Sequence, residues 1–415
     1  VESPTNDFFG GHRPGNNLFG ETLVCVDLKT GQRKWHYQLV HHPLWDHDIS
    51  SAPILADITV NGRAIKAVAQ PSKQGFVYVF DRVTGQPVWP IEERPVEKGE
   101  VPGEWYAPTQ PIPTKPPAYN RNGVIVDYLI DFTPEMRAGA VKAVAKYKLG
   151  PIYTPPVVSR LEGPLATLTL ATASGGTNWP GASYDPETHT VYAPACDACL
   201  TSIGLVVPPS KEISDMNYVH GIADRPFRIS RGPGEGAGAD SPPPTPPPPP
   251  APGRAPAGGG GGDRLNVQGL PLIKPPYGTL SAISLDKGEI VWQVAHGETP
   301  DVVRNHEALK GRNIPRTGQA ASVGALVTKT LVISGDGEFT TTAERPRGAM
   351  LRAYDKATGK EVGAVYMPAP QSGSPMTYRL NGKQYIVVAV SGGPYSGEYL
   401  AFALPAESAK TSSAR

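Results

Sequence analysis

One short pattern recurs along the chain and limits the fold more than any other feature. Each copy reads as an apolar run, an Asp, a few residues that include Gly, and a second apolar run that often carries Trp. Asp starts a tight turn through side-chain hydrogen bonds, and Gly supplies the positive φ that other residues avoid. The copies lie at 23–37, 77–91, 182–195, 280–294 and 351–365.

Repeated strand–turn–strand units of this kind predict an all-β fold. The recurring Trp is expected to pack between neighbouring units, and the irregular spacing of the copies fits a β-propeller with long loops between its blades. A stack of unrelated hairpins is the alternative, but the shared order of Asp, Gly and Trp argues against it. Gly and Pro, 46 and 47 of 415 residues, agree with a turn-rich chain.

Two segments interrupt the repeats. Residues 132–150 read as an inserted helix, because Thr133 suits the N-cap, Pro134 suits the first turn and Gly150 can end it. Residues 231–263 are rich first in Pro and then in Gly. Such a composition cannot bury a core, so we expect a disordered surface loop there.

The rest of the chain is expected to form one partial propeller domain over 1–405, followed by a tail at 406–415. The formal net charge of +1 gives no argument for a nucleic-acid partner or an anionic membrane surface. No run of eighteen apolar residues is present, so we expect no transmembrane helix. The first residues, "VESPTNDFFGG", show no signal peptide and resemble the interior of a domain, which predicts a fragment of a longer protein.

Cysteine is scarce. Cys25 alternates with apolar residues and is expected in a buried strand. Cys196 and Cys199 form a C-x-x-C motif, but it lacks both the following His of a c-type haem site and the second C-x-x-C of a zinc site. A local disulfide in an oxidising compartment and a pair of free thiols both remain open.

The stretch "HHPLWDHD", residues 41–48, holds three histidines and two carboxylates. It follows the first repeat and therefore lies on a loop at the end of a blade. There, Asp46 can act as a general base or as a ligand for a hard cation such as calcium. His41 and His42 point to opposite faces of an extended chain, so a zinc site that also uses His47 is less favoured than hydrogen bonding to the loop.

Two further segments carry candidate binding residues. "QPSKQGF" places Lys73 just before a strand, and "SGGTNWPG" places Asn178 and Trp179 after a Gly pair that allows close approach of a ligand. Together these side chains can hold a flat, anionic, carbonyl-rich cofactor through charge, hydrogen bonds and stacking. Each alone is equally typical of a solvated Lys, a turn Asn or a core Trp, so the residues by themselves leave the ligand unknown.

Taken together, four segments resemble the dehydrogenases that depend on pyrroloquinoline quinone (PQQ), and they are most similar to the branch that oxidises glucose, quinate and polyols. The segments are "NDFFGGHRPGNNLFGETLVCVDLKTGQRKWHYQLVHHPLWDHD" (6–48), "PSKQGFVYVFDRVTGQPVWP" (71–90), "SGGTNWPGASYDP" (174–186) and "SGSPMTYRLNGKQYIVVAVSGG" (372–393). Their order and spacing make the resemblance specific, and it covers most of the chain except the Pro/Gly tract. It implies an eight-bladed propeller, about half to two-thirds of it in this chain, with PQQ and calcium, or magnesium, near the axis.

The resemblance also assigns roles to individual residues. Asp46 matches the catalytic base that lies beside the metal. Lys73 matches the cation that bonds the PQQ quinone oxygens, and it would stabilise the developing oxyanion. Asn178 matches a PQQ contact, with Trp179 adjacent to it.

The metal-binding Asn of the family should fall within "VESPTND", where Ser3 and Asn6 both remain candidates. Another metal ligand and other cofactor contacts belong to the part of the family that precedes this segment. We therefore expect weak activity, or none, from this chain alone.

The function implied by the resemblance is periplasmic oxidation of an alcohol, a sugar or a polyol, with hydride transfer to PQQ. No C-x-x-C-H motif occurs, so the electrons would pass to an external acceptor such as cytochrome c or ubiquinone. One alternative is a non-catalytic propeller scaffold built from the same repeats. Another is a different propeller enzyme, such as a calcium-dependent lyase or hydrolase.

Overall fold

The computed structural model describes residues 1–224, 265–342, 345, 347–393 and 395–404. Within these residues the chain forms 24 β-strands, two α-helices and two 3-10 helices, so the all-β prediction is confirmed. The expected loop at 231–263 and the tail at 406–415 lie outside the described residues. Among the described helices, none is both long and apolar enough to cross a membrane.

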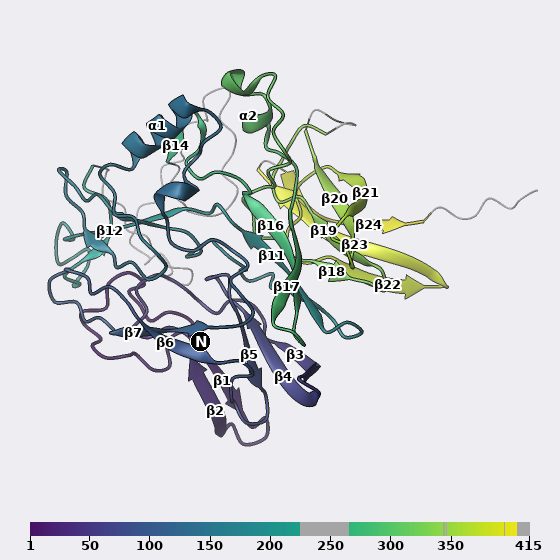
Figure 1. Cartoon of the computed structure of the whole chain (residues 1–415), viewed down its shortest axis with the longest axis horizontal. Coiled ribbons are helices and arrows are strands. Elements are labelled where there is room, and N and C mark those ends of the chain that lie inside the picture. The colour runs from purple at the N-terminus through teal and green to yellow at the C-terminus, as the bar shows by residue number, and fades with distance from the viewer. Residues whose placement is uncertain (225–264, 343–344, 346, 394, 405–415) are drawn as a thin grey trace, which may run out of the picture.

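Five sheets follow one another in chain order and form the blades of a propeller (Figure 1). The first pairs β1 (Thr22–Val26) with β2 (Arg33–Gln38), and the second contains β3 (Ile54–Val60), β4 (Arg63–Pro71) and β5 (Val77–Asp81). The third contains β10 (Ser183–Asp185), β11 (Thr190–Cys196), β16 (Gly278–Ser284) and β17 (Glu289–Ala295). The fourth contains β18 (Leu326–Val327), β19 (Leu331–Gly335), β20 (Ala349–Asp355) and β21 (Glu361–Met367), and the fifth β22 (Met376–Leu380), β23 (Lys383–Gly392) and β24 (Tyr395–Ala403).

The remaining elements are insertions, which lie mainly on the left and at the top of Figure 1. One insertion is a hairpin of β6 (Ile91–Pro95) and β7 (Thr109–Pro113). In a second insertion, β12 (Thr201–Val206) pairs with β8 (Val157–Val158), β9 (Thr167–Thr169) and β13 (Val219–His220). The others are β14 (Asn266–Val267), β15 (Leu270–Pro271), the helices α1 (Pro134–Ala143) and α2 (Asp301–Arg304), and the 3-10 helices η1 (Val126–Tyr128) and η2 (Glu307–Leu309).

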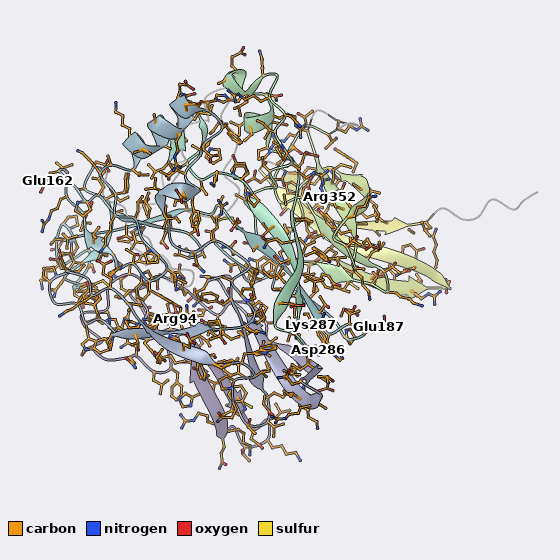
Figure 2. All side chains as sticks on the ribbon, in the orientation of Figure 1. Arg94, Glu162, Glu187, Asp286, Lys287 and Arg352 are labelled. Atoms are coloured by element: carbon orange, nitrogen blue, oxygen red, sulfur yellow. A yellow bond between two sulfur atoms is a disulfide. The ribbon has the colours of Figure 1, made fainter. Side chains whose placement is uncertain are left out.

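The repeated turns form as their sequence predicts. In the first, the Asp27 side chain accepts hydrogen bonds from the backbone N–H groups of Lys29 and Thr30, at 3.1 and 3.0 Å. Gly31, at φ 70°, donates its N–H to the Asp27 carbonyl and closes the turn. In the third blade, Figure 2 shows Glu187, Asp286 and Lys287 near one another at the tips of such hairpins.

The recurring Trp packs on the Gly of the next blade, as predicted. A Cβ on Gly85 would lie 2.6 Å from the Trp35 ring, and one on Gly359 would lie 2.6 Å from the Trp292 ring. The Trp35 Nε1–H also donates to the Arg82 carbonyl at 3.0 Å, within that same turn. The turn Gly therefore serves two purposes, because it adopts positive φ and leaves room for the indole of the preceding blade.

The core lies between the blades. One buried cluster joins the second blade to the third, and it includes Ile58, Val79, Val191 and Ile283. Each of these strands alternates buried and exposed residues or is buried on both faces, as packed blades require. Further buried clusters join the third blade to the fourth and the fourth to the fifth.

The inserted helix is present but shorter than the expected 132–150. Thr133 caps it by accepting a hydrogen bond from the Met136 N–H, and Pro134 occupies the first turn, as predicted. The helix ends at Ala143, so the prediction that Gly150 ends it was wrong. Gly150 instead exchanges backbone hydrogen bonds with Val124, and this pairing competes with continuation of the helix.

Candidate active site

The loop after β2 is held rigidly and presents Asp46. Trp45 is buried, and its indole N–H donates to the Thr154 carbonyl at 2.9 Å. Its ring also packs edge-on against the Tyr153 ring, with 5.2 Å between the ring centroids. Asp46 itself has φ 55°, an uncommon conformation for a residue with a side chain. Such backbone strain is typical of functional sites and has to be held in place by the packing around it.

Lys73 lies just beyond the end of β4 and meets two carboxylates of this loop. Its ammonium group lies 2.9 Å from Asp46 Oδ1 and 3.0 Å from Asp48 Oδ2. It also donates to the backbone carbonyl of Asp46 at 3.3 Å. Side-chain exposure is 5% for Lys73, 17% for Asp46 and 22% for Asp48, so the two carboxylates remain open to solvent while the cation lies behind them.

Glu21 and Ser3 complete the cluster. Glu21 is fully buried, and its Oε1 accepts hydrogen bonds from the Ser3 hydroxyl and, at 2.9 Å, from the His47 N–H. The Ser3 N–H donates to Asp48 Oδ1 at 2.7 Å. Asn6, the other candidate, instead donates to the Tyr218 carbonyl at 3.3 Å. Of the two residues left open by the sequence, the structure therefore brings Ser3 into the acidic cluster.

The charges of the cluster do not balance. Burial, aided by the neighbouring Asp48, raises the pKa of Asp46 to about 8 against the opposing charge of Lys73. Burial likewise raises the pKa of Glu21 to about 8, and the negative charges of Asp48 and Asp46 add to the effect. Both carboxyls therefore hold protons at neutral pH.

The neighbours of these two acids titrate in the opposite sense. Burial opposes ionisation of Asp48, but hydrogen bonds from Asp46 and Ser3, together with the charge of Lys73, lower its pKa to about 2. Burial also opposes the charge on Lys73, yet the two aspartates hold its pKa above the usual value. Burial, followed by the charge of Lys73, lowers the pKa of His47 to about 3, so His47 is neutral.

The loop that carries Asn178 and Trp179 packs directly on the Lys73 turn. Gly176, at φ 55°, leaves no room for a side chain, because a Cβ there would lie 1.9 Å from the Lys73 carbonyl oxygen. Asn178 Oδ1 accepts from the Ser50 hydroxyl at 3.0 Å, which ties it to the Asp46 loop. Asn178 therefore lies at the site mainly as a brace, since its amide N–H₂ also donates to the Ala173 carbonyl at 3.1 Å.

Trp179 differs from the other tryptophans discussed so far, because 64% of it is exposed. A Cβ on Gly373 would come within 3.9 Å of its ring, and Ser374 bonds the neighbouring Pro180 carbonyl at 3.3 Å. The segment 372–393 thus approaches the same region as the segment 174–186. An exposed indole on a braced loop offers a face for stacking.

The three histidines of "HHPLWDHD" do not meet. His41 lies 3.0 Å from Glu93, whereas buried His42 lies 3.0 Å from Glu104 and 2.7 Å from the Gly15 carbonyl. His47 packs against the Trp45 ring, with 6.1 Å between the centroids. His42 thus has the backbone-bonding role that the sequence favoured over a zinc site.

A disulfide lies behind the Asn178 loop. Cys196, the last residue of β11, pairs with Gly176 through backbone hydrogen bonds and is bonded to Cys199. Of the two readings of the C-x-x-C motif, the structure therefore supports the disulfide. Cys25 lies in β1 as expected, but it is only partly buried because it belongs to the outer two-stranded sheet.

The oxygen-rich donor set suits a hard divalent cation in chemistry, since it offers carboxylates and a hydroxyl. In the described part of the chain, however, no three His, Cys, Asp or Glu side chains are arranged as a ready metal site. The Lys73 ammonium instead bridges Asp46 and Asp48. For a planar anionic cofactor, the exposed Trp179 and the adjacent Lys73 provide the stacking and the positive charge that are needed.

Sequence reasoning had identified Asp46, Lys73, Asn178 and Trp179, and the structure gathers them around one loop. It had not assigned a role to Asp48, although Asp48 follows Asp46 by only two positions. Glu21 was missed altogether. Its one local signal is an acidic residue at the start of the apolar run "TLVCV".

Comparison with known proteins adds a family. The family model for the PQQ β-propeller domain of glucose/ethanol/alcohol dehydrogenases matches residues 1–386. The chain is 29% identical over 414 residues to the probable quinate dehydrogenase (quinone) of Xanthomonas campestris pv. juglandis, covering 97% of this chain and 47% of that protein. It is also 29% identical over 421 residues to the quinoprotein glucose dehydrogenase of Escherichia coli K12, covering 97% and 46%. The chain thus spans about half the length of the curated relatives it matches.

Among solved structures, the chain is similar to the quinohemoprotein alcohol dehydrogenase from Comamonas testosteroni. The TM-score is 0.45 at 19% sequence identity. The match covers 90% of this chain and 39% of that chain.

Proposed function

Because the chain belongs to the PQQ-dependent glucose/ethanol/alcohol dehydrogenase β-propeller family, we propose that it carries the proton-accepting site of an enzyme that oxidises a CH–OH group. The substrate is an alcohol, a sugar or a polyol. The observation that carries the proposal is the contact of Lys73 with Asp46, a partly exposed carboxyl whose pKa is raised to about 8. A base that titrates near neutral pH is well matched to accepting a proton from a hydroxyl.

Asp46 takes the substrate hydroxyl proton in this proposal. Ionised Asp48 lies beside it and accepts a hydrogen bond from the protonated form, which favours arrival of the proton. Lys73 holds the two carboxyls in place and offers positive charge to an oxyanion that forms next to it. The rigid Trp45 anchor keeps this geometry fixed during turnover.

PQQ, when bound, supplies the hydride acceptor, and a divalent cation such as calcium supplies Lewis acidity. Trp179 would stack on the cofactor, Lys73 would bond its oxygens, and Asn178 would brace the loop between them. Asp46 would contact the cation. Glu21 and Asp48 lie in the same acidic cluster.

We place the reaction in the periplasm, where the Cys196–Cys199 disulfide would persist. The electrons would leave to an external acceptor, cytochrome c or a quinone. The name of the Xanthomonas relative, a quinate dehydrogenase (quinone), supports the second choice.

A PQQ titration tests the proposal. Binding should quench Trp fluorescence in the presence of calcium and weaken when calcium is chelated. Lys73→Ala should weaken binding by about 10- to 100-fold, the usual loss for a charge-assisted contact. Lys66→Ala, on the exposed part of β4, is the matched control and should bind as the wild type does.

Binding that Lys73→Ala leaves unchanged would place the cofactor elsewhere. Circular dichroism of the variant excludes unfolding as the cause of a loss. If neither this chain nor the product of the complete gene binds PQQ, the proposal is wrong and the scaffold alternative takes its place.

A further inference from the structure

Glu21 is the least satisfied charged group in the described part of the site. Its side chain has no exposed surface, and its Oε2 has no hydrogen-bond partner among the described residues. A buried carboxyl oxygen without a partner costs free energy, so such atoms are rare in folded proteins unless they have a use. Glu21 also has φ 44°, the second strained backbone of the cluster after Asp46.

The charges around Glu21 call for a cation. Glu21, Asp46 and Asp48 face the single ammonium of Lys73, so full ionisation would leave two uncompensated negative charges. Arg13 also faces Glu21, but it is shared with Glu104 and Asp7. His47 is neutral. A divalent cation would supply the missing charge.

The donors are also of the right kind and are linked to one another. Ser3 connects Glu21 to Asp48, through its hydroxyl on one side and its N–H at 2.7 Å on the other. The His47 N–H holds Glu21 Oε1 at 2.9 Å, which leaves Oε2 available. Calcium takes six to eight oxygen ligands, several of them carboxylate, so a second acidic donor beside Asp46 fits its needs.

Resting on the proposed function, we propose that Glu21 is a ligand of the divalent cation at this site and supplies Oε2 beside the carboxylates of Asp46 and Asp48. In the absence of the cation, two protons balance the cluster, on Glu21 and on Asp46. Binding of the cation displaces these two protons to solvent, so total charge is conserved. Glu21 binds the cation and does not touch the substrate.

Calorimetric titration of the chain with calcium chloride, without PQQ, tests this assignment. Repeating it at pH 7 in buffers of different ionisation enthalpy counts the protons released, and we expect about two per calcium ion. Glu21→Gln should weaken calcium affinity at least tenfold and release about one proton fewer. Its amide oxygen can still accept from Ser3 and His47, so the loop should keep its shape.

Glu2→Gln is the matched control, because Glu2 is exposed and its backbone carbonyl bonds the Glu21 N–H at 3.2 Å. It removes one nearby negative charge without touching the cluster, and its affinity should stay within about twofold of the wild type. If Glu21→Gln does not fold, infrared difference spectra of the wild type replace it. Calcium should then abolish the C=O stretch of two protonated carboxyl groups.

Three outcomes would overturn the assignment: equal affinity in Glu21→Gln, loss of only one protonated carboxyl in the infrared spectrum, or no binding of calcium or magnesium by the wild type. None of these bears on PQQ, which is absent from the assay. The dehydrogenase proposal fails on a different observation, namely absence of PQQ binding or its indifference to Lys73→Ala. The two failures are therefore distinguishable.

Discussion

Two clusters of buried charge in this molecule are built in opposite ways. In the fourth blade, Arg352 lies among the strands (Figure 2) and is 3% exposed. Its guanidinium bonds both oxygens of fully buried Asp336, at 2.6 and 3.0 Å, and reaches Glu361 at 3.1 Å. Each buried donor thus meets an acceptor of opposite charge.

The pKa values of that cluster move in the directions that favour ionisation. Burial opposes the charge on Arg352, but Asp336 and Glu361 raise its pKa above the usual value. Burial also opposes ionisation of Glu361, but Arg316 and Arg352 lower its pKa. This is an ion network that is complete in the folded chain and serves to join strands.

The cluster around Asp46 is incomplete by the same measure. Its acids outnumber its cations, and the pKa values of Glu21 and Asp46 are both raised to about 8. The comparison teaches that burial alone does not mark a functional site. A surplus of one charge, with an oxygen left unpaired, distinguishes a site that awaits a ligand from one that only holds the fold together.

The largest effect should come from Asp46→Asn in the complete enzyme. The amide cannot accept the hydroxyl proton, so kcat should fall by about 10²- to 10⁴-fold, the range of general base catalysis. Steady-state kinetics would measure this, with circular dichroism to verify the fold. Asp57→Asn, at an exposed ion pair with Arg82, is the control. Wild-type kcat in Asp46→Asn would remove Asp46 from the role of base.

The next largest effect separates the two clusters by stability. Asp336→Asn leaves Arg352 buried beside a neutral amide, and the free energy of unfolding should fall by about 3–5 kcal/mol. Asp46→Asn removes a carboxyl that the cluster already keeps protonated, so its stability should be equal to or above that of the wild type. Urea unfolding at pH 8 measures both. Equal losses would mean that the clusters do not differ in kind.

A third effect concerns pH. In the folded chain Glu21 keeps its proton up to about pH 8, whereas in the unfolded chain it ionises near its model value of 4.5. Between these values the unfolded state binds fewer protons, so stability should fall as pH rises, by about 1.4 kcal/mol per pH unit for each such group. Asp48 contributes the opposite trend, but that stability is lost only as pH falls toward its pKa of about 2, outside this window.

Glu21→Gln should therefore flatten the loss of stability between about pH 5 and 8 in the chain without added cation. Unfolding curves at several pH values would show it, with Glu2→Gln as the control. A variant that follows the wild-type slope would mean that Glu21 is ionised throughout. The charge argument for a cation at this cluster would then be weaker.

Much of the fold could be predicted because its signals are local. The turn at Asp27 and Gly31 is specified within five residues, and the Trp35 that follows belongs to the same repeat. The end of the inserted helix could not be predicted, because Gly150 pairs with Val124 through a contact that no local pattern encodes. Where tertiary pairing competes with helix propensity, the tertiary pairing prevails.

The site divides along the same line. Asp46 and Lys73 were found through resemblance to a family, and their contact at 2.9 Å agrees with roles in one site. Glu21 gave no such signal, since the general rule places carboxylates at the surface. Its burial follows from long-range contacts with Ser3 and His47, which bring separate parts of the chain together.

The smallest effect tests how far the balanced cluster extends. Arg316 also bonds Glu361, but it is 37% exposed, and Arg352 contacts the same carboxylate from the buried side. Exposed ion pairs contribute little, so Arg316→Gln should cost less than about 1 kcal/mol of unfolding free energy. Urea unfolding beside Asp336→Asn measures the contrast. A loss as large as that of Asp336→Asn would mean that the network depends on its rim, and that the boundary between its buried core and solvent lies further out than Arg352.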